Sequence, residues 1–337
     1  MKKFLFLVIS FLLLSGCSST SRNIDTLPAT NGIKIKPYFS QTGSNYNLGG
    51  GIDDLIVEEI KSAKKSLRLA VFGFTNDRLR DALIVAHKKG VDVIVVTDDG
   101  EFYKDDIVVL KDAGVEVLND ENPNALMHHK FLVIDGAVVW SGSANYSYYA
   151  FYKNNENLVK ITSSKIAKVY LDEFKELYEK KDYEGAFLSD SLEIYFSPED
   201  DFEQRLIQLI EDANISIDFL AFAFTNEKIS DALKTKFNEG VKIRGVFDKK
   251  QNNGFLKRYS KYNTLLSHGL DVKLDGNRQT MHNKVFIIDG KTVVTGSYNF
   301  TVKANKQNNE NIIIIHNKEF TYHYLEEFET IWSLGEN

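Results

Sequence analysis

Residues 127–145 read MHHKFLVIDGAVVWSGSAN, and residues 281–299 read MHNKVFIIDGKTVVTGSYN. In both stretches a histidine and a lysine stand two residues apart, an Asp-Gly pair separates two apolar runs, and Gly-Ser-x-Asn follows. Asp-Gly between runs of strand-forming residues is the strongest short signal for a β-hairpin. The two stretches therefore predict the same strand and hairpin twice in one chain.

The sequence around these two stretches is repeated as well. FGFTN at 72–76 returns as FAFTN at 222–226, and NNEN occurs at 154–157 and at 308–311. From the histidine motif to the glutamate of NNEN, the offset between the copies is constant at 154 residues. A repeat of this length is a domain rather than a solenoid unit. We predict two similar lobes, at 34–182 and 190–335, joined within 181–190 and arranged as a pseudo-dimer.

Strand and helix patterns alternate within the first copy. Apolar runs at 67–74 and 91–98 predict strands, and amphipathic spacing at 78–90, 103–114 and 164–181 predicts helices, the last of which closes the lobe. This alternation predicts an α/β fold. Each lobe would have a mixed sheet flanked by helices, with one site at the interface between the lobes.

Composition limits the classes of function. The chain has 337 residues, 43% of them hydrophobic and 26% charged, which is typical of packed globular domains. The formal net charge is −6, so the overall balance does not favour a surface that coats nucleic acid, and any anion site must be local. The single cysteine, Cys17, excludes disulfides within the chain.

The first residues have the parts of an export signal. Two lysines follow Met1, residues 4–14 are mostly apolar, and Leu14-Ser15-Gly16-Cys17 comes next. That ending resembles the lipobox of bacterial lipoproteins, whose cysteine becomes lipidated. We expect a signal peptide at 1–17, a polar tether at 18–33, and an exported lipoprotein anchored in the bacterial cell envelope through Cys17, in the outer membrane if the host is Gram-negative. An uncleaved anchor or a chance cysteine are the alternatives.

Strand geometry separates the two adjacent histidines. Side chains alternate faces along a strand, so His128 and Lys130 point one way and His129 the other. The second copy keeps His282 and Lys284 but has an asparagine, Asn283, at the position that matches His129. An imidazole and an ammonium on one face form an anion site suited to phosphate chemistry. We expect His129 to be a supporting or surface residue.

The complete pattern, H-x-K-x4-D-x6-G-S-x-N, resembles the HKD motif of the phospholipase D superfamily. The resemblance covers nearly all of the chain after the tether, and the short loops are most similar to Nuc-type bacterial endonucleases and to mitochondrial cardiolipin hydrolases. It implies one phosphodiester site shared by both copies, with no metal or cofactor. The catalytic motif residues are His128, Lys130, Asp135, His282, Lys284 and Asp289. The supporting residues are Ser143, Asn145, Glu156, Ser297, Asn299 and Glu310.

Displacement at a phosphodiester needs a nucleophile on one side of phosphorus and a proton donor on the other. By resemblance, His128 is the nucleophile and His282 the acid and base, although the near-symmetry of the copies leaves that order open. The two lysines, with Asn145 and Asn299, would hold the non-bridging oxygens.

The remaining residues are expected to orient the reacting groups. The two glutamates would accept hydrogen bonds from the far ring nitrogens of the histidines, and the two serines would act similarly. For Asp135 and Asp289 we favour building the hairpin over reacting, because an aspartate before glycine suits a tight turn. Gly142 and Gly296 are expected to be needed for the backbone conformation rather than to contact a ligand.

Other interpretations are weaker. The sequence has no H-E-x-x-H and no cysteine set, and the acidic pairs at 98–99 and 105–106 suit solvated loops better than a metal site. The aromatic stretch NYSYYAFY at 145–152 suits either a substrate groove or a packed interface between the lobes. Both motifs are complete, which disfavours a non-catalytic binding lipoprotein.

The expected partner is a phospholipid substrate, because a membrane tether would place the site beside lipid headgroups. Single-stranded or double-stranded nucleic acid is the alternative. A monomer is expected, since one chain contains both copies of the motif that together form the site.

Overall fold

The structure is a computed structural model that describes residues 27–28, 32–40, 42, 50–181 and 185–336. Lobe 1 contains β1 (Leu27–Pro28), β2 (Lys34–Phe39), α1 (Ile52–Ser62), β3 (Ser66–Val71), β4 (Phe74–Thr75), α2 (Asp77–Lys88), β5 (Asp92–Thr97), α3 (Asp105–Asp112), β6 (Glu116–Asn119), β7 (Lys130–Ile134), β8 (Val138–Gly142), β9 (Tyr146–Ser147), α4 (Tyr148–Tyr152), β10 (Asn157–Thr162) and α5 (Ser164–Glu179). Lobe 2 contains β11 (Phe187–Leu188), β12 (Leu192–Ser197), α6 (Phe202–Glu211), β13 (Ser216–Ala221), α7 (Glu227–Asn238), β14 (Lys242–Phe247), the 3-10 helix η3 (Leu256–Arg258), α8 (Tyr262–His268), β15 (Asp271–Leu274), β16 (Lys284–Ile288), β17 (Thr292–Gly296), α9 (Val302–Lys306), β18 (Glu310–His316) and α10 (Lys318–Leu334).

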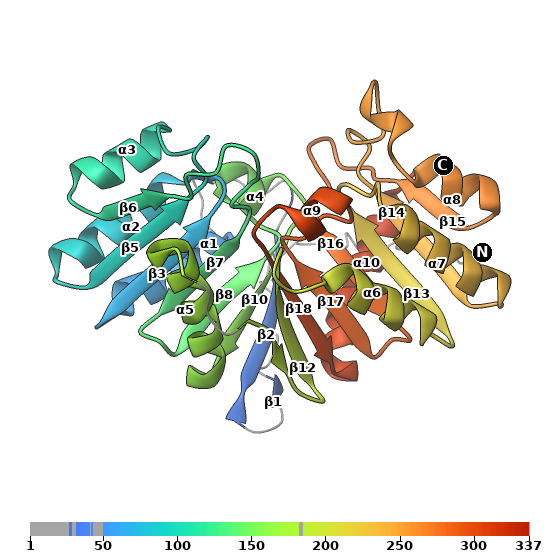
Figure 1. Ribbon diagram of the computed structural model, residues 1–337, viewed down its shortest axis with the longest axis horizontal. Helices are drawn as coiled ribbons and strands as arrows, with labels where there is room; N and C mark the ends of the chain where they lie inside the picture. Colours follow the sequence, from blue (N-terminus) through green and yellow to red (C-terminus); the bar gives the residue numbers. More distant parts are fainter. Residues whose placement is uncertain (1–26, 29–31, 41, 43–49, 182–184, 337) are drawn as a thin grey trace, which may run out of the picture.

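The two lobes have the same sheet. Its strand order is β1-β2-β10-β8-β7-β3-β5-β6 in lobe 1 and β11-β12-β18-β17-β16-β13-β14-β15 in lobe 2. In each sheet three strands run parallel, β3-β5-β6 and β13-β14-β15, and the strand that carries the histidine motif pairs antiparallel with the first of them. This confirms the predicted α/β class with a mixed sheet in each lobe. The sheet edges that contain β2 and β12 lie near each other in the middle of the molecule (Figure 1).

Local sequence explains where these elements begin and turn. The side chains of Asn76 and Asn226 cap α2 and α7 by accepting a hydrogen bond from the backbone N–H three residues on. Asp135 and Gly136 both have positive φ, 52° and 62°, in the tight turn between β7 and β8, which the backbone N–H of Ala137 closes by donating to the carbonyl of Ile134. The equivalent turn in lobe 2 has the same conformation.

Three hydrophobic clusters form the core, and one of them is shared by both lobes. In the shared cluster Tyr170 of α5 packs edge-on against Phe196 of β12, with ring centroids 5.4 Å apart. Symmetrically, Tyr324 of α10 packs against Phe39 of β2 at 5.0 Å. Each closing helix therefore covers part of the other lobe, which fixes how the two halves of the site face each other.

Several expectations need adjustment. The strand predicted at 67–74 ends at Val71, and Leu27–Pro28, within the predicted tether, pairs with β2. Strands β10 and β18, which begin at the last asparagine and at the glutamate of NNEN respectively, were not assigned from the sequence. The predicted signal peptide and Cys17 lie outside the described residues. Within the described ranges, no helix is both long and apolar enough to cross a membrane.

Candidate active site

The two motif histidines stand just before β7 and β16, where backbone from the two lobes interlocks. The backbone N–H of His128 donates to the carbonyl of Asn309 at 2.9 Å, and that of His282 donates to the carbonyl of Asn155 at 2.9 Å. Each histidine is thus held by the segment that precedes the other lobe's glutamate. The side chains of His128 and His282 are only 8% and 11% exposed.

Glu156 and Glu310 orient the histidines, and they do so across the lobe boundary. Nδ1 of His128 lies 2.7 Å from a carboxylate oxygen of Glu310, and Nδ1 of His282 lies 2.9 Å from one of Glu156. The predicted pairing of glutamates with histidines is therefore present, but each pair joins two lobes.

The motif serines act on these glutamates rather than on the histidines. Ser143 donates its hydroxyl to Glu156 at 2.7 Å, and Ser297 donates to Glu310 at 2.6 Å. Each carboxylate is thereby fixed by its own lobe before it reaches the other lobe's imidazole.

This arrangement determines which ring nitrogen can react. A carboxylate only accepts hydrogen bonds, so Nδ1 carries the proton in both rings and a neutral ring keeps its lone pair on Nε2. Burial lowers the pKa of both His128 and His282 to about 4, although the neighbouring glutamates oppose that shift. Near neutral pH the ligand-free site therefore holds two neutral imidazoles.

Lys130 and Lys284 bring two buried cations to the same place. Each ammonium donates to the backbone carbonyl of its motif histidine, at 2.7 Å and 2.5 Å. The residues are 0% and 2% exposed, and no carboxylate of the described chain lies within ion-pair distance. Burial lowers their pKa to about 8 for Lys130 and about 7 for Lys284. Buried cations without a counter-ion are poised for an anionic ligand.

Two phenylalanines that the sequence analysis did not select line the site. Phe72 lies 5.2 Å from His128 between ring centroids, and Phe222 lies 4.5 Å from His282. The ammonium groups of Lys130 and Lys284 lie 5.5 Å and 4.6 Å from the same two rings. The sequence does contain a signal for these two residues, because each is the first residue of a repeated stretch, FGFTN or FAFTN.

The motif asparagines follow β8 and β17 at the same end of each sheet. Asn145 accepts a weak hydrogen bond from the backbone N–H of Gly73 at 3.3 Å through Oδ1, which leaves its amide nitrogen available. Oδ1 of Asn299 has no hydrogen-bond partner among the described residues. Their contact with a substrate phosphate stays a prediction.

Asp135 and Asp289 are not part of this cluster. The carboxylate of Asp135 accepts three backbone N–H groups, from residues 64, 65 and 66, and that of Asp289 accepts those of 214, 215 and 216. Although burial opposes it, these donors hold the pKa of both carboxyl groups below the usual value. They tie the hairpin to the loop before β3 or β13, at the far end of β7 or β16 from the histidine.

Gly142 shows why the motif needs a glycine there. A Cβ at this position would lie 2.4 Å from the backbone oxygen of Asn157 on β10, and Gly296 has the same relation to Asn311. The expected backbone requirement is thus a close approach between neighbouring strands.

His129 faces away from the site, as strand alternation predicts, and it is buried rather than on the surface. Its Nε2 lies 2.6 Å from Glu173 of α5. Burial lowers the pKa of His129 to about 4 and raises that of Glu173 well above its usual value. This neutral pair joins β7 to the closing helix.

The expectation that the acidic pair at 98–99 is a solvated loop charge is wrong for Asp98. This carboxylate is buried and accepts the backbone N–H of Met127 at 3.1 Å, and Asp248 accepts that of Met281 at 3.0 Å. These residues hold the backbone immediately before each motif histidine. Carboxylate oxygens of Asp98, Asp99 and Asp120 lie within 4.8 Å of one another.

The aromatic stretch at 145–152 mainly fills lobe 1. Tyr146, Phe151 and Tyr152 are buried in the cluster of lobe 1, and only Tyr149 is well exposed, at 56%. Tyr152 donates its hydroxyl to the buried Asp53 at 2.7 Å.

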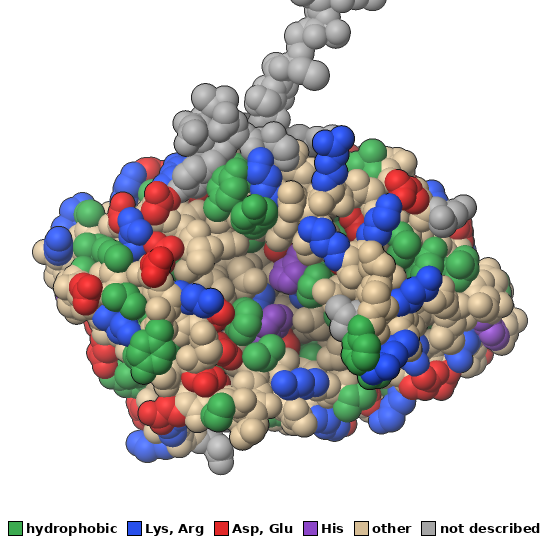
Figure 2. All heavy atoms as spheres, turned by 90° about the horizontal axis from the view of Figure 1, so that it is seen from above, with side chains coloured by type: hydrophobic (Ala, Val, Ile, Leu, Met, Phe, Trp, Pro, Cys, Tyr) green, Lys and Arg blue, Asp and Glu red, His purple; other side chains and the backbone are tan. Residues whose placement is uncertain are grey.

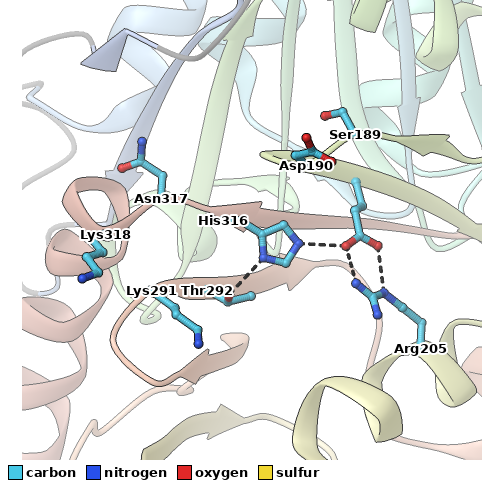
Figure 3. Close-up of a pocket in the computed structure, with 9 residues that line it drawn as sticks. Ser189, Asp190, Arg205, Lys291, Thr292, His316, Asn317 and Lys318 are labelled. Atoms are coloured by element: carbon cyan, nitrogen blue, oxygen red, sulfur yellow. Dashed lines mark hydrogen bonds and ion pairs between the residues drawn. The ribbon is translucent and has the colours of Figure 1, made fainter. Parts of the chain in front are cut away.

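The space-filling view shows the site as a hollow between the two halves of the molecule, with histidine side chains at its centre (Figure 2). A separate pocket of about 510 Å³ lies at the opposite end of β17 and β18 (Figure 3). There His316 bridges Glu193 at 2.8 Å and Thr292 at 3.0 Å, and Arg205 also binds Glu193. These groups satisfy one another and join three strands to α6, and none of the catalytic or supporting motif residues is among them.

Comparison with known proteins agrees with this geometry. A family model described as "Cardiolipin synthase, PLD-like domain" matches residues 56–178 and again 206–332. The chain is 38% identical over 129 residues to a mitochondrial cardiolipin hydrolase of Xenopus laevis, an alignment that covers 38% of this chain and 61% of that protein. It is 37% identical over 131 residues to a phospholipase D of Rickettsia prowazekii, covering 39% of this chain and 62% of that protein.

A solved structure shares the fold along most of the chain. The phosphatidylserine synthase of Haemophilus influenzae superimposes with a TM-score of 0.67 over 89% of this chain and 86% of that one, at 14% identity. The family model matches each lobe once and covers well over half of the chain. The chain therefore belongs to the phospholipase D-like family, with two copies of the family's domain.

Proposed function

We propose that this protein is a phosphodiesterase of the phospholipase D type that hydrolyses the headgroup ester of phospholipids to phosphatidic acid. The observation that carries the proposal is the pairing of two histidines, each oriented by the other lobe's glutamate, with two buried lysines that lack a counter-ion. This set supplies a nucleophile, a proton donor and charge stabilisation around one phosphate.

The first step forms a covalent intermediate. Nε2 of one histidine attacks phosphorus, a P–N bond forms, and the P–O bond to the headgroup alcohol breaks. The other histidine, protonated on Nε2, gives its proton to the leaving oxygen. The lysines hold the non-bridging oxygens as negative charge gathers on them. By family resemblance we assign His128 as nucleophile and His282 as acid.

In the second step His282 acts as a base, and water releases the product from the intermediate. The now neutral His282 takes a proton from water, the oxygen of which attacks phosphorus while the P–N bond breaks. Phosphatidic acid leaves, and both histidines return to their starting states. If an alcohol replaces water, the same step gives a new phosphatidyl ester, which is transphosphatidylation.

Phospholipid is the preferred substrate for two reasons. The relatives described above are named as a phospholipase D and a cardiolipin hydrolase. The lipobox-like sequence that ends at Cys17 would anchor the protein in the cell envelope, close to headgroups. We propose that the protein acts there as an exported, monomeric lipoprotein.

The substrate assay offers vesicles of phosphatidylcholine, phosphatidylglycerol or cardiolipin beside single-stranded DNA and RNA, with EDTA present. We expect phosphatidic acid from at least one lipid and no dependence on metal. Release of oligonucleotide without phosphatidic acid would show a nuclease instead.

The catalytic assignment is tested on bis(p-nitrophenyl) phosphate, a soluble diester. His128→Ala and His282→Ala should each lower kcat by at least about a thousandfold, because each removes a reacting group. His129→Asn is the matched control, since the second lobe already has asparagine there, and should keep most of the activity. Unchanged turnover in both alanine variants would contradict the assignment.

A further inference from the structure

One loop at the rim of the site differs between the lobes. The offset between the copies is 150 residues up to the end of β5 and β14 but 155 at AGVEV and HGLDV, so lobe 2 has five extra residues between these points. The segment 249–261 contains five lysines and arginines and no acidic residue. In lobe 1 the segment that precedes the next helix, α3, is DGEFYK at 99–104, which has two acidic residues and one lysine.

The loop lies at the same end of the sheet as the reacting groups. It follows β14, which runs parallel to β13, and the last residue of β13, Ala221, pairs with both Phe247 and Lys284. The loop rises at the top right of Figure 1, and in the view from above basic side chains predominate to the right of the hollow, where lobe 2 lies (Figure 2).

Apolar and cationic side chains are exposed together on this loop. Phe255 is 65% exposed and Tyr259 49%. The Arg258 guanidinium lies 3.5 Å and 4.6 Å from the two ring centroids, and the rings contact each other edge-on with their centroids 5.7 Å apart. Lys250 and Lys257 are exposed and, like Arg258, have no carboxylate partner in the described part of the chain. Exposed apolar side chains that are rimmed by polar or charged groups mark interaction surfaces.

The patch continues onto the segment after the second motif. The backbone N–H of Lys261 donates to the carbonyl of Phe224 at 2.9 Å, and Phe224 forms a β-bridge with Phe300. Two residues later, at the start of α9, Val302 is 58% exposed. The docking rim, defined as the loop 249–261 with Val302, is therefore one surface beside the site.

We propose that the docking rim seats the protein on an anionic phospholipid surface and presents headgroups to the site from the lobe 2 side. Phenylalanine, tyrosine and valine enter the interface between headgroups and acyl chains. Lys250, Lys257 and Arg258 gain from the negative surface, whereas Lys249 and Lys261 already pair with Glu336 and Glu227. A nucleic acid drawn through the site would also meet the acidic rim of lobe 1, which disfavours it. The inference rests on the proposed function in taking phospholipid as the substrate class.

The kinetic test uses the full chain with Lys250→Glu and Lys257→Glu together. We expect turnover of phosphatidylglycerol vesicles to fall about tenfold or more, because two attractive charges become repulsive, while turnover of bis(p-nitrophenyl) phosphate stays unchanged. Lys104→Glu on the matching loop of lobe 1 is the control and should change neither rate. An equal loss in the control, or unchanged vesicle turnover in the double variant, would overturn the proposal.

A second measurement is independent of catalysis. Phe255→Trp should shift its fluorescence emission to the blue when phosphatidylglycerol vesicles are added, and less with phosphatidylcholine, whereas Tyr103→Trp on the lobe 1 rim should not shift. If the emission of Phe255→Trp shifts but the protein forms no phosphatidic acid from the vesicles, the docking rim stands and the proposed reaction is rejected. No shift at Phe255→Trp, or a shift produced only by single-stranded DNA, would reject the docking rim.

Discussion

At the scale of single residues, the site has an unusual charge state. The two histidines are neutral near pH 7 in the ligand-free site, yet the proposed reaction needs one of them protonated as the acid. We expect kcat/KM for the soluble diester to peak below pH 6. It should fall as the pH rises, because the acid histidine, with a pKa of about 4, loses its proton. Above about pH 7 the fall should steepen as Lys284 loses its charge. A bound phosphate favours the protonated groups, so the kcat profile should lie at higher pH than that of kcat/KM. Parallel pH titrations measure both, and an optimum above pH 8 would contradict this account.

At the scale of elements, the hairpin that carries the motif is held by its aspartate. Asp135→Ala removes the acceptor of three backbone N–H groups, so it should lower the free energy of unfolding by about 2 kcal/mol. Asp135→Asn keeps the turn preference and should cost less. At a temperature where both variants are folded, turnover of the soluble diester should stay within about threefold of the parent. Urea denaturation and steady-state kinetics measure the two effects. A folded Asp135→Asn variant without activity would instead give this residue a catalytic role.

At the scale of the whole molecule, the shared hydrophobic cluster should make the lobes unfold as one unit. The chain has two tryptophans, Trp140 in lobe 1 and Trp332 in lobe 2, so variants that keep only one report on each lobe separately. Their urea midpoints should coincide. Phe196→Ala, in the shared cluster, should lower both midpoints together, at a cost of about 3–5 kcal/mol. Two separate transitions, or a loss confined to lobe 2, would show that the lobes are independent.

The sequence by itself determined the repeat, the α/β class, the hairpins and the motif residues. These depend on local patterns: alternation along a strand, turn chemistry at Asp-Gly, and helical spacing. Alternation also separated His128 from His129, because that choice needs only the geometry of one strand.

Only the tertiary structure decided which groups meet. The exchange of glutamates between lobes depends on contacts between residues 182 and 126 positions apart, and no local pattern specifies such a pairing. The packed structure also buries Asp98 against the backbone N–H of Met127, and it buries Lys130 and Lys284 with no carboxylate of the described chain within ion-pair distance. The charge state of the site follows from desolvation in the packed interface, which the sequence alone does not reveal.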